Sequence, residues 1–323
     1  MNSFEYAAPS TLKEATALLG DTWGQTEVLA GGTDLLTSLK QGLTSPKRLV
    51  SLKNIAELKG ISEESGGLRI GAMATLGELA DNAAVKKNFP SLVTAAEGVG
   101  SPQLLSVGTV GGDLCQRPRC WYFRNGFGLL AQQNGKSLVR EGDNRYHAIF
   151  GTDAPALFVS ASSLGPALVA LGASITIAGP NGKTKKVEAA KFFQTPKTEK
   201  DRETILEPKQ VVTEIVIPVK GLKNATYEVR HRHGLDWPYV TASVAFGGRS
   251  GDTRVVLGHV ATVPWVARDA ASALADAGAI NDAAAEKCGK AAVRGAKPLS
   301  QNQYKVQLAQ TAIKRAILAA AKA

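Results

Sequence analysis

Two pairs of consecutive glycines stand where the backbone could hold a phosphate group. The first lies in Ala30-Gly31-Gly32-Thr33-Asp34 and the second in the GTVGGD segment at residues 108–113. Consecutive glycines let backbone N–H groups point into one concavity, and they let a diphosphate approach without a Cβ in its way. A tight turn that only needs a positive φ would explain either site alone. Two turns of similar design in one chain favour a diphosphate cradle.

Neither turn carries the motifs of the common nucleotide sites. The GxGxxG of dinucleotide-binding βαβ units and the GxxxxGK[ST] of P-loops are both absent from the two turns, so nicotinamide-dependent hydride transfer and nucleotide hydrolysis lose their usual signatures. No nucleophile elbow is present either, which argues against a hydrolase. A different kind of diphosphate site is indicated.

The cysteines and histidines give weak signals. Cys115, Cys120 and Cys288 are the three cysteines, and an odd number in a chain of this size argues against a disulfide framework. Cys115 and Cys120 could have a redox role, or they could be small structural side chains at a turn. His231 and His233 could share one face of a strand, but no Cys or carboxylate cluster stands nearby in sequence. We therefore expect no metal site.

Short elements alternate around these turns. Thr11 and Glu14 have the spacing of a capping box before an apolar helix face. Strands are predicted at residues 27–30, where the chain enters the first turn, and at 48–52 and 68–73; helices are predicted after the first turn and at 75–81 and 89–99. The first 100 residues therefore have an α/β rhythm.

The later part of the chain has a different pattern. A long central loop is predicted at 113–150, a hairpin with an Asn181-Gly182 turn at 167–187, and a linker at 194–203. We place a domain boundary near residue 200. Four strand-like runs follow at 211–218, 225–232, 240–247 and 254–261, before an alanine-rich helical region. The last third is predicted to be an antiparallel sheet with helices packed against it.

Composition and charge limit the class of protein. The 323 residues are 44% hydrophobic and 20% charged, which excludes disorder for the bulk of the chain. No membrane span or signal peptide is recognised, so we expect a cytoplasmic protein. Of the +10 net charge, much lies in residues 286–323, which hold eight Lys/Arg and one acid. Because this region lacks the aromatic side chains on which bases stack, we expect no nucleic acid to bind. We expect an apolar stripe from Val306 to Ala320 to dock on the sheet. Four cations of the same segment would then face outward: Lys305, Lys314, Arg315 and Lys322.

Four segments together resemble a known family. They are VLAGGTDLL at 28–36, LRIGAMATLGEL at 68–79, SVGTVGGDLCQRPRCWYF at 106–123 and ILEPKQVVTEIVIP at 205–218. In this order and spacing they resemble the FAD-binding (medium) subunit of the xanthine dehydrogenase and carbon monoxide dehydrogenase family of molybdenum hydroxylases. The resemblance runs from residue 2 to beyond residue 290.

The resemblance implies an α+β fold. Two subdomains of the vanillyl-alcohol-oxidase (PCMH) type would hold an extended FAD between them, at 1–58 and 59–200, and a C-terminal α+β domain at 201–323 would close over the flavin ring. The diphosphate would lie between the two glycine turns, Val211 and Val212 would approach the isoalloxazine, and Tyr122 would take the place of an acid that family members have near the ribose. Asp34 and Asp113 are expected to face sugar hydroxyls or backbone donors. The expected FAD-binding residues are Leu29, Ala30, Gly31, Gly32, Thr33, Asp34, Leu35, Gly108, Thr109, Gly111, Gly112, Asp113, Tyr122, Val211 and Val212.

The function implied is electron transfer within a hetero-oligomer. A molybdopterin-binding large subunit and a [2Fe-2S] small subunit would be the partners, the molybdopterin and the iron–sulfur clusters would lie on those partners only, and bound FAD would pass their electrons to an external acceptor. No side chain need be catalytic, since the flavin carries the chemistry. A flavin-free scaffold subunit and a basic nucleic-acid-binding protein are the alternatives.

The central segment CQRPRCWYF resembles one branch more closely, that of aldehyde oxidoreductases and hydroxybenzoyl-CoA reductases. In that branch a loop of the flavin subunit binds a [4Fe-4S] cluster, which needs about four thiolates. Residues 123–147 contain no cysteine. We therefore expect the isolated chain to carry only trace iron, measured by metal analysis after anaerobic purification. About four irons per chain with a reducible cluster signal would contradict this expectation.

Overall fold

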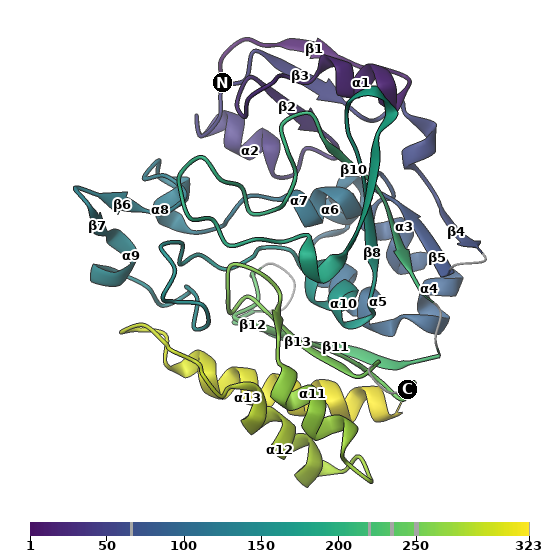
Figure 1. The fold of residues 1–323 in the computed structure, drawn as a ribbon, viewed down its shortest axis with the longest axis vertical. Helices are drawn as coiled ribbons and strands as arrows, with labels where there is room; N and C mark the ends of the chain where they lie inside the picture. Colours follow the sequence, from purple (N-terminus) through teal and green to yellow (C-terminus); the bar gives the residue numbers. More distant parts are fainter. Residues whose placement is uncertain (65–66, 219–220, 233–235, 249–251, 323) are drawn as a thin grey trace.

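The computed structural model describes residues 1–64, 67–218, 221–232, 236–248 and 252–322. It contains a small parallel sheet near the N-terminus, a five-stranded sheet in the middle of the chain, and a four-stranded antiparallel sheet covered by the last helices (Figure 1). Within the described residues, no helix is long and apolar enough to cross a membrane.

The N-terminal unit is a three-stranded parallel sheet in the order β1-β3-β2. Helix α1 begins at the predicted capping box, because the Thr11 hydroxyl accepts from the Glu14 amide and the Glu14 carboxylate accepts from the Thr11 amide. Strand β2 leads into the first glycine turn, and α2 follows it. The elements are β1 (Glu5–Ala7), α1 (Leu12–Leu18), β2 (Thr26–Leu29), α2 (Leu35–Lys40), β3 (Arg48–Ser51) and the 3-10 turn η1 (Ala56–Leu58).

The middle unit is a five-stranded sheet in the order β4-β5-β10-β8-β9. Its buried core joins the sheet to helices α3, α5 and α10. The predicted hairpin is confirmed for β8 and β9, with Asn181 at φ 60° and Gly182 at φ 71° in the turn, although residues 164–170 before it form a helix. The elements up to this hairpin are β4 (Ile61–Glu64), β5 (Gly67–Gly71), α3 (Leu76–Asp81), α4 (Ala83–Asn88), α5 (Pro90–Glu97), α6 (Pro102–Val107), α10 (Leu164–Ala170), β8 (Ser174–Ala178), η2 (Pro180–Gly182), β9 (Thr184–Glu188) and η3 (Ala189–Lys191).

Strand β10 (Val211–Ile217) corrects one expectation. We assigned it to the C-terminal antiparallel sheet, but it lies between β5 and β8 in the middle sheet, where Ile215 pairs with Ile70 and with Ile175. These three isoleucines are fully buried. The strand takes this place because it can pair on both edges while its apolar side chains join the main core. Residues that follow the predicted boundary near residue 200 thus belong to this sheet.

The central loop contains short elements of its own. They are α7 (Val110–Cys115), α8 (Trp121–Arg124), β6 (Gln132–Gln133), β7 (Lys136–Ser137) and α9 (Leu138–Glu141). Leu129, Leu130, Ala156 and Phe158 are buried together, and Cys120 packs against them. The loop is therefore held by a small apolar core.

The predicted linker at 194–203 instead fastens this loop. The Glu199 carboxylate accepts hydrogen bonds from the amides of Leu129 and Leu130, at 2.5 and 2.9 Å. Four residues later, Glu203 accepts from Arg117 at 2.9 Å. The polar composition that suggested a linker therefore includes carboxylates that bind the central loop.

The C-terminal unit is a four-stranded antiparallel sheet in the order β11-β12-β13-β14 with three helices on one face (Figure 1). Every residue of β12 is buried, because the helices cover one face and the middle unit covers the other. The elements are β11 (Lys223–Val229), β12 (Val240–Phe246), β13 (Arg254–Gly258), β14 (Trp265–Val266), α11 (Arg268–Ala275), α12 (Asp282–Ala292) and α13 (Tyr304–Lys322).

Helix α13 docks on the sheet as expected, through buried Ala309, Ile313, Ile317 and Ala320. The expectation that Lys305 faces outward is wrong, since this side chain is 1% exposed. Its ammonium donates to the backbone carbonyls of Tyr146, His147 and His259 at 3.3, 3.1 and 2.6 Å. Lys305 thus ties the start of α13 to the central loop and to the end of β13.

The other predicted outward cations differ in their surroundings. Lys314 forms ion pairs with Asp282 at 2.7 Å and Glu286 at 3.6 Å, and Arg315 donates to the Tyr227 hydroxyl. Lys322 is exposed. Because Lys314 and Arg315 already have partners within the chain, they offer less charge to another molecule than the sequence suggested.

The burial of Lys305 predicts a pH dependence. Burial lowers the pKa of Lys305 from 10.5 to about 7. Between these two values the unfolded chain binds more protons than the folded chain, so stability rises with pH. Measured by urea denaturation across this window, the free energy of unfolding of the wild type should rise relative to that of Lys305→Met.

Lys314→Met is the matched control. Hydrogen bonding to Asp282 raises the pKa of Lys314, so its contribution to stability stays constant below pH 10.5. The difference between wild type and Lys314→Met should therefore be flat across the same window. A flat difference for Lys305→Met as well would show that Lys305 is not buried as an amine of low pKa.

Candidate functional site

The two glycine turns and strand β10 line one cleft of about 220 Å³. The first turn follows β2. The second runs into the first turn of α7, with Thr109 as its N-cap and Gly111 and Gly112 inside the helix, and the isolated bridge between Thr75 and Thr109 fixes it beside α3. Eleven of the fifteen expected FAD-binding residues line this cleft. They are Ala30, Gly31, Gly32, Thr33, Asp34, Leu35, Thr109, Gly111, Gly112, Val211 and Val212.

Four expected residues are not in the lining. Leu29 ends β2 and pairs with Ser51, while Gly108 is buried beneath the second turn, where its carbonyl accepts from the Leu76 amide. Asp113 is buried behind the cleft. Tyr122 packs on the other side of the central loop, with its ring 5.9 Å from that of His147.

The first turn presents free hydrogen-bond donors. Among the described residues, the backbone amides of Gly31, Gly32, Thr33 and Asp34 donate to no protein acceptor. Gly32 is buried and has φ +78°, a conformation that glycine adopts without strain. Successive unpaired N–H groups around a turn of this kind form a concavity that binds anions, phosphates above all. The turn therefore fits a diphosphate.

The two turns also touch. A Cβ built on Gly31 would lie 1.8 Å from the Val107 carbonyl oxygen, so only glycine lets the first turn approach the end of α6 and the second turn. In the second turn the amides of Val110, Gly111 and Gly112 already donate within the protein, to Ala74, Ala72 and Thr109. This turn therefore contributes a floor without side chains rather than free N–H donors.

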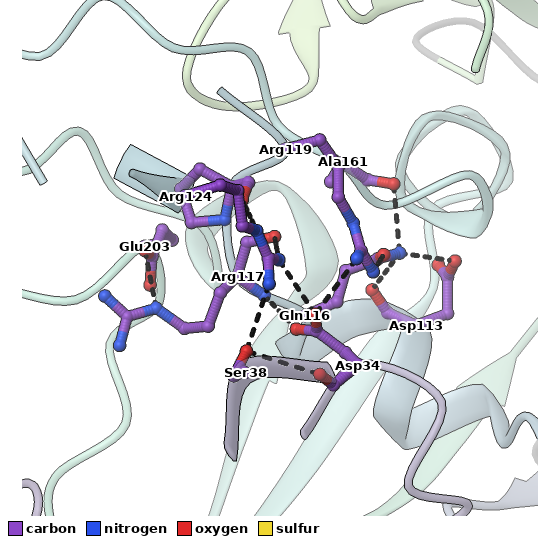
Figure 2. A network of polar contacts seen from close by, with 10 residues as sticks. Asp34, Ser38, Asp113, Gln116, Arg117, Arg119, Arg124, Ala161 and Glu203 are labelled. Atoms are coloured by element: carbon purple, nitrogen blue, oxygen red, sulfur yellow. Dashed lines mark hydrogen bonds and ion pairs between the residues drawn. The ribbon is translucent and has the colours of Figure 1, made fainter. Parts of the chain in front are cut away.

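A carboxylate at the end of the first turn holds the cleft together (Figure 2). Asp34 accepts from the Arg117 amide at 2.7 Å and from Arg124 at 2.8 Å, and it pairs with Arg119 at 3.0 Å. Arg124 also donates to the Ser38 hydroxyl at 3.0 Å. Asp34 thus links α2 to the central loop, and the expectation that it faces backbone donors is confirmed for one of its oxygens.

Asp113 plays a matching part in the second turn. Its carboxylate accepts from the Ser162 hydroxyl at 2.5 Å and from the amides of Ser163 and Leu164 at 3.2 and 3.0 Å. Burial raises the pKa of Asp113, and these three donors oppose that effect. The alternative of backbone donors is therefore confirmed for Asp113, which fastens α7 to the start of α10.

The sequence missed several residues of the cleft. Trp23 lies under the Arg202 guanidinium, 4.5 Å from it, and Glu27 and Glu203 are also in the lining. Burial raises the pKa of Glu203, with Arg117 acting in the opposite direction. Neither Trp23 nor Arg202 lies in a motif, so a local pattern could not have identified them.

The cysteines stay apart. The Cys115 side chain opens to the cleft, yet the protein packed around it and the nearby Asp113 and Glu203 raise its pKa to about 12. The Cys120 thiol lies 3.1 Å from the His147 Nε2, and Cys288 is buried in α12. Among the described residues no group of three or more His, Cys, Asp or Glu could hold a metal ion. His231 is exposed, and His233 lies outside the described residues.

A cleft with free amides on one glycine turn and residues without side chains on the other fits a diphosphate-containing cofactor. Residues 2–220 match the family described as the FAD binding domain in molybdopterin dehydrogenase, and residues 225–320 match the CO dehydrogenase flavoprotein C-terminal domain. The chain therefore belongs to the FAD-binding subunits of the xanthine dehydrogenase family of oxidoreductases.

Relatives and solved structures agree along the whole chain. The aldehyde oxidoreductase FAD-binding subunit PaoB of Escherichia coli is 30% identical, with 100% of this chain and 99% of the relative covered. The carbon monoxide dehydrogenase medium chain of Hydrogenophaga pseudoflava is 29% identical, over 98% and 96%. The structure of quinoline 2-oxidoreductase from Pseudomonas putida 86 superimposes with a TM-score of 0.76 at 25% identity, covering 99% of this chain and 98% of that chain. These matches confirm the predicted fold class and family.

The contacts of Asp34 predict the effect of removing it. Asp34→Ala leaves Arg119 and Arg124, which are 28% and 12% exposed, without their shared carboxylate. Unpairing such partly buried charges costs roughly 2 to 4 kcal/mol. Chemical denaturation should show this loss, and trypsin should cut the central loop faster.

Asp81→Ala is the control, because Asp81 pairs with Lys86 on the surface and is 85% exposed. An exposed pair contributes at most about 1 kcal/mol. Equal losses of stability in the two variants would mean that Asp34 does not anchor the central loop.

Proposed function

We propose that this chain binds FAD in the cleft between the two glycine turns and passes electrons through it. The observation that carries the proposal is the row of free amides from Gly31 to Asp34, which faces the cleft beside Gly111 and Gly112. A diphosphate needs several donors and close approach to the backbone, and this arrangement provides both.

The residues of the chain bind and orient the cofactor. The first turn would hold the diphosphate, and Val211 and Val212 on β10 would pack against the flavin ring. Trp23 and Arg202 at the other side of the cleft would border the remainder of the cofactor. FAD supplies one- and two-electron chemistry, so the protein need contribute only binding, orientation and electrostatics.

We further propose that the partners are a molybdopterin-binding large subunit and a [2Fe-2S] small subunit. Support comes from the relatives named as medium chains and FAD-binding subunits, which are similar to this chain over nearly its whole length. Electrons would arrive from the iron–sulfur subunit and leave to an external acceptor.

Two alternatives would leave the purified chain colourless. A scaffold subunit of such a complex would keep the fold but bind no flavin. A nucleic-acid-binding protein would use the basic C-terminal region, although the in-chain partners of Lys314 and Arg315 weaken that case. Absorption bands near roughly 450 nm and FAD released on denaturation separate the proposal from both.

Gly32→Val is predicted to abolish FAD retention. Valine at φ +78° is strained, and its branched Cβ would crowd Leu36 and Leu29 at 3.2 and 3.3 Å in the turn that holds the diphosphate. Gly112→Val should have the same effect, because a Cβ there would lie 2.8 Å from the Thr109 hydroxyl, which also lines the cleft. The FAD content of each purified variant is measured from its absorption spectrum.

Gly60→Val is the matched control. Gly60 has φ +79°, and apart from Gly60 and its two chain neighbours no atom of the described residues lies within 4 Å of the position that a Cβ would take there. Valine at this position therefore causes the same backbone strain away from the cleft. This variant should be less stable but should keep its FAD. Stoichiometric FAD in folded Gly32→Val and Gly112→Val would place the cofactor elsewhere.

A further inference from the structure

A second pocket lies between the central loop and the C-terminal unit. Its volume is about 410 Å³, within the range of small-molecule sites. Aromatic rings form much of its wall. They belong to Trp121, Tyr146, Phe158, Trp237 and Tyr239. Arg119 lies over the Trp237 ring at 4.8 Å, and Trp121 meets Tyr146 edge to face at 5.5 Å.

The pocket contains buried polar atoms that have no partner among the described residues. His147 and His259 are 3% and 2% exposed. The His147 Nδ1, the His259 Nε2 and the Arg119 Nε make no hydrogen bond there. Buried polar atoms are satisfied in most proteins, so three unpaired atoms around one cavity point to a ligand.

The two imidazoles are neutral. Burial lowers the pKa of His147 to about 4 and of His259 to about 3, with the Lys305 charge adding to both effects. Burial also raises the pKa of Cys120, so this thiol keeps its proton and can donate it to the His147 Nε2, 3.1 Å away, when the ring is in its Nδ1–H tautomer. The His147 Nδ1 then carries the ring proton and can donate to a ligand.

The backbone conformation of His259 supports a role for this residue in ligand binding. His259 has φ +61°, which is uncommon for a residue other than glycine. Its Nδ1 lies 3.1 Å from the Thr241 hydroxyl, and its carbonyl accepts from Lys305. Backbone strain of this kind persists where the surrounding structure holds a side chain in a working position.

The pocket adjoins the FAD cleft and opens to solvent. Arg119 lines the pocket and pairs with Asp34, which lines the cleft. On the outer side, His231 and Arg232 are exposed, and Trp237 is 42% exposed. A molecule could therefore enter from solvent and reach the neighbourhood of the cleft.

We propose that this pocket binds a planar quinone, which accepts electrons from FAD in the neighbouring cleft. The aromatic walls would stack on its rings, and the N–H groups at His147 Nδ1, His259 Nε2 and Arg119 Nε would donate to its carbonyl oxygens. The quinone gains two electrons from FADH2, which returns to oxidised FAD, and takes up two protons through solvent, equal in number to those that FADH2 releases, so that a hydroquinone forms. The guanidinium of Arg119 favours the negative charge that builds up on the oxygens, and Lys305 adds to this effect below its pKa of about 7, where its ammonium is charged. The acceptor role rests on the proposed FAD function, whereas binding does not.

The first test measures binding of 2-methyl-1,4-naphthoquinone to the full chain by equilibrium dialysis. We expect saturable binding of one molecule per chain. His259→Asn and Trp237→Leu should weaken it about tenfold or more, the effect of losing one good contact. Asparagine tolerates positive φ, so His259→Asn should keep its fold.

Trp23→Leu is the control, because Trp23 lies in the FAD cleft and not in this pocket. It should lower FAD content and leave quinone affinity unchanged. Absence of quinone binding in the wild type, or equal affinity in wild type and His259→Asn, would overturn the proposal. Loss of FAD from folded His259→Asn would also overturn it, since the pocket would then hold part of the flavin.

The second test measures electron delivery. FAD-loaded chain is reduced under anaerobic conditions and mixed with the quinone, and reoxidation is followed at the flavin absorption bands. Reoxidation should saturate with quinone concentration, and His259→Asn should need about tenfold more quinone for the same rate. A linear dependence with equal slopes in both proteins would contradict an acceptor site. A wild type that binds quinone but retains no FAD would refute the proposed function and leave the binding site standing.

Discussion

The organisation of the cleft depends on one carboxylate, Asp34. It ends the first glycine turn, yet its partners Arg117, Arg119 and Arg124 all come from the central loop, more than 80 residues away in sequence. A carboxylate shared by two guanidinium groups and a backbone amide satisfies charges that partial burial would otherwise leave costly. The same contact connects two cavities, since Asp34 lines the cleft between the glycine turns and Arg119 lines the second pocket, whose walls are largely aromatic.

The C-terminal unit and the central loop together form the second pocket. Lys305 reaches from α13 to the carbonyls of the central loop and of His259, so the wall of the aromatic pocket is held by an element far from it in sequence. Within the loop, Cys120 packs on the small apolar core and lies 3.1 Å from the His147 Nε2, and the Glu199 carboxylate binds the Leu129 amide of the same core. The pocket therefore exists only when three separate segments are folded together.

Local features were predictable from sequence. The glycine turns, the Thr11 capping box and the Asn181-Gly182 hairpin each depend on residues within a few positions of one another. The place of β10 in the middle sheet, the clamp at Glu199 and the burial of Lys305 depend on partners that are distant in the chain. No periodicity records such partners, and a lysine is expected at the surface unless its acceptors are known. The second pocket could not be predicted from a motif for the same reason, since its lining residues come from distant segments.

The position of β10 has a consequence for biosynthesis. It is the central strand of its sheet, but it is the last of the five to be synthesised. Until the ribosome has made β10, the strands β5 and β8 each have one edge without a hydrogen-bonded neighbour, because β10 is the strand that pairs with both. Unpaired edges of this kind invite contacts with other chains. The cleft therefore stays incomplete until β10 supplies Val211 and Val212 to its lining, and in this interval a chaperone would be of most use.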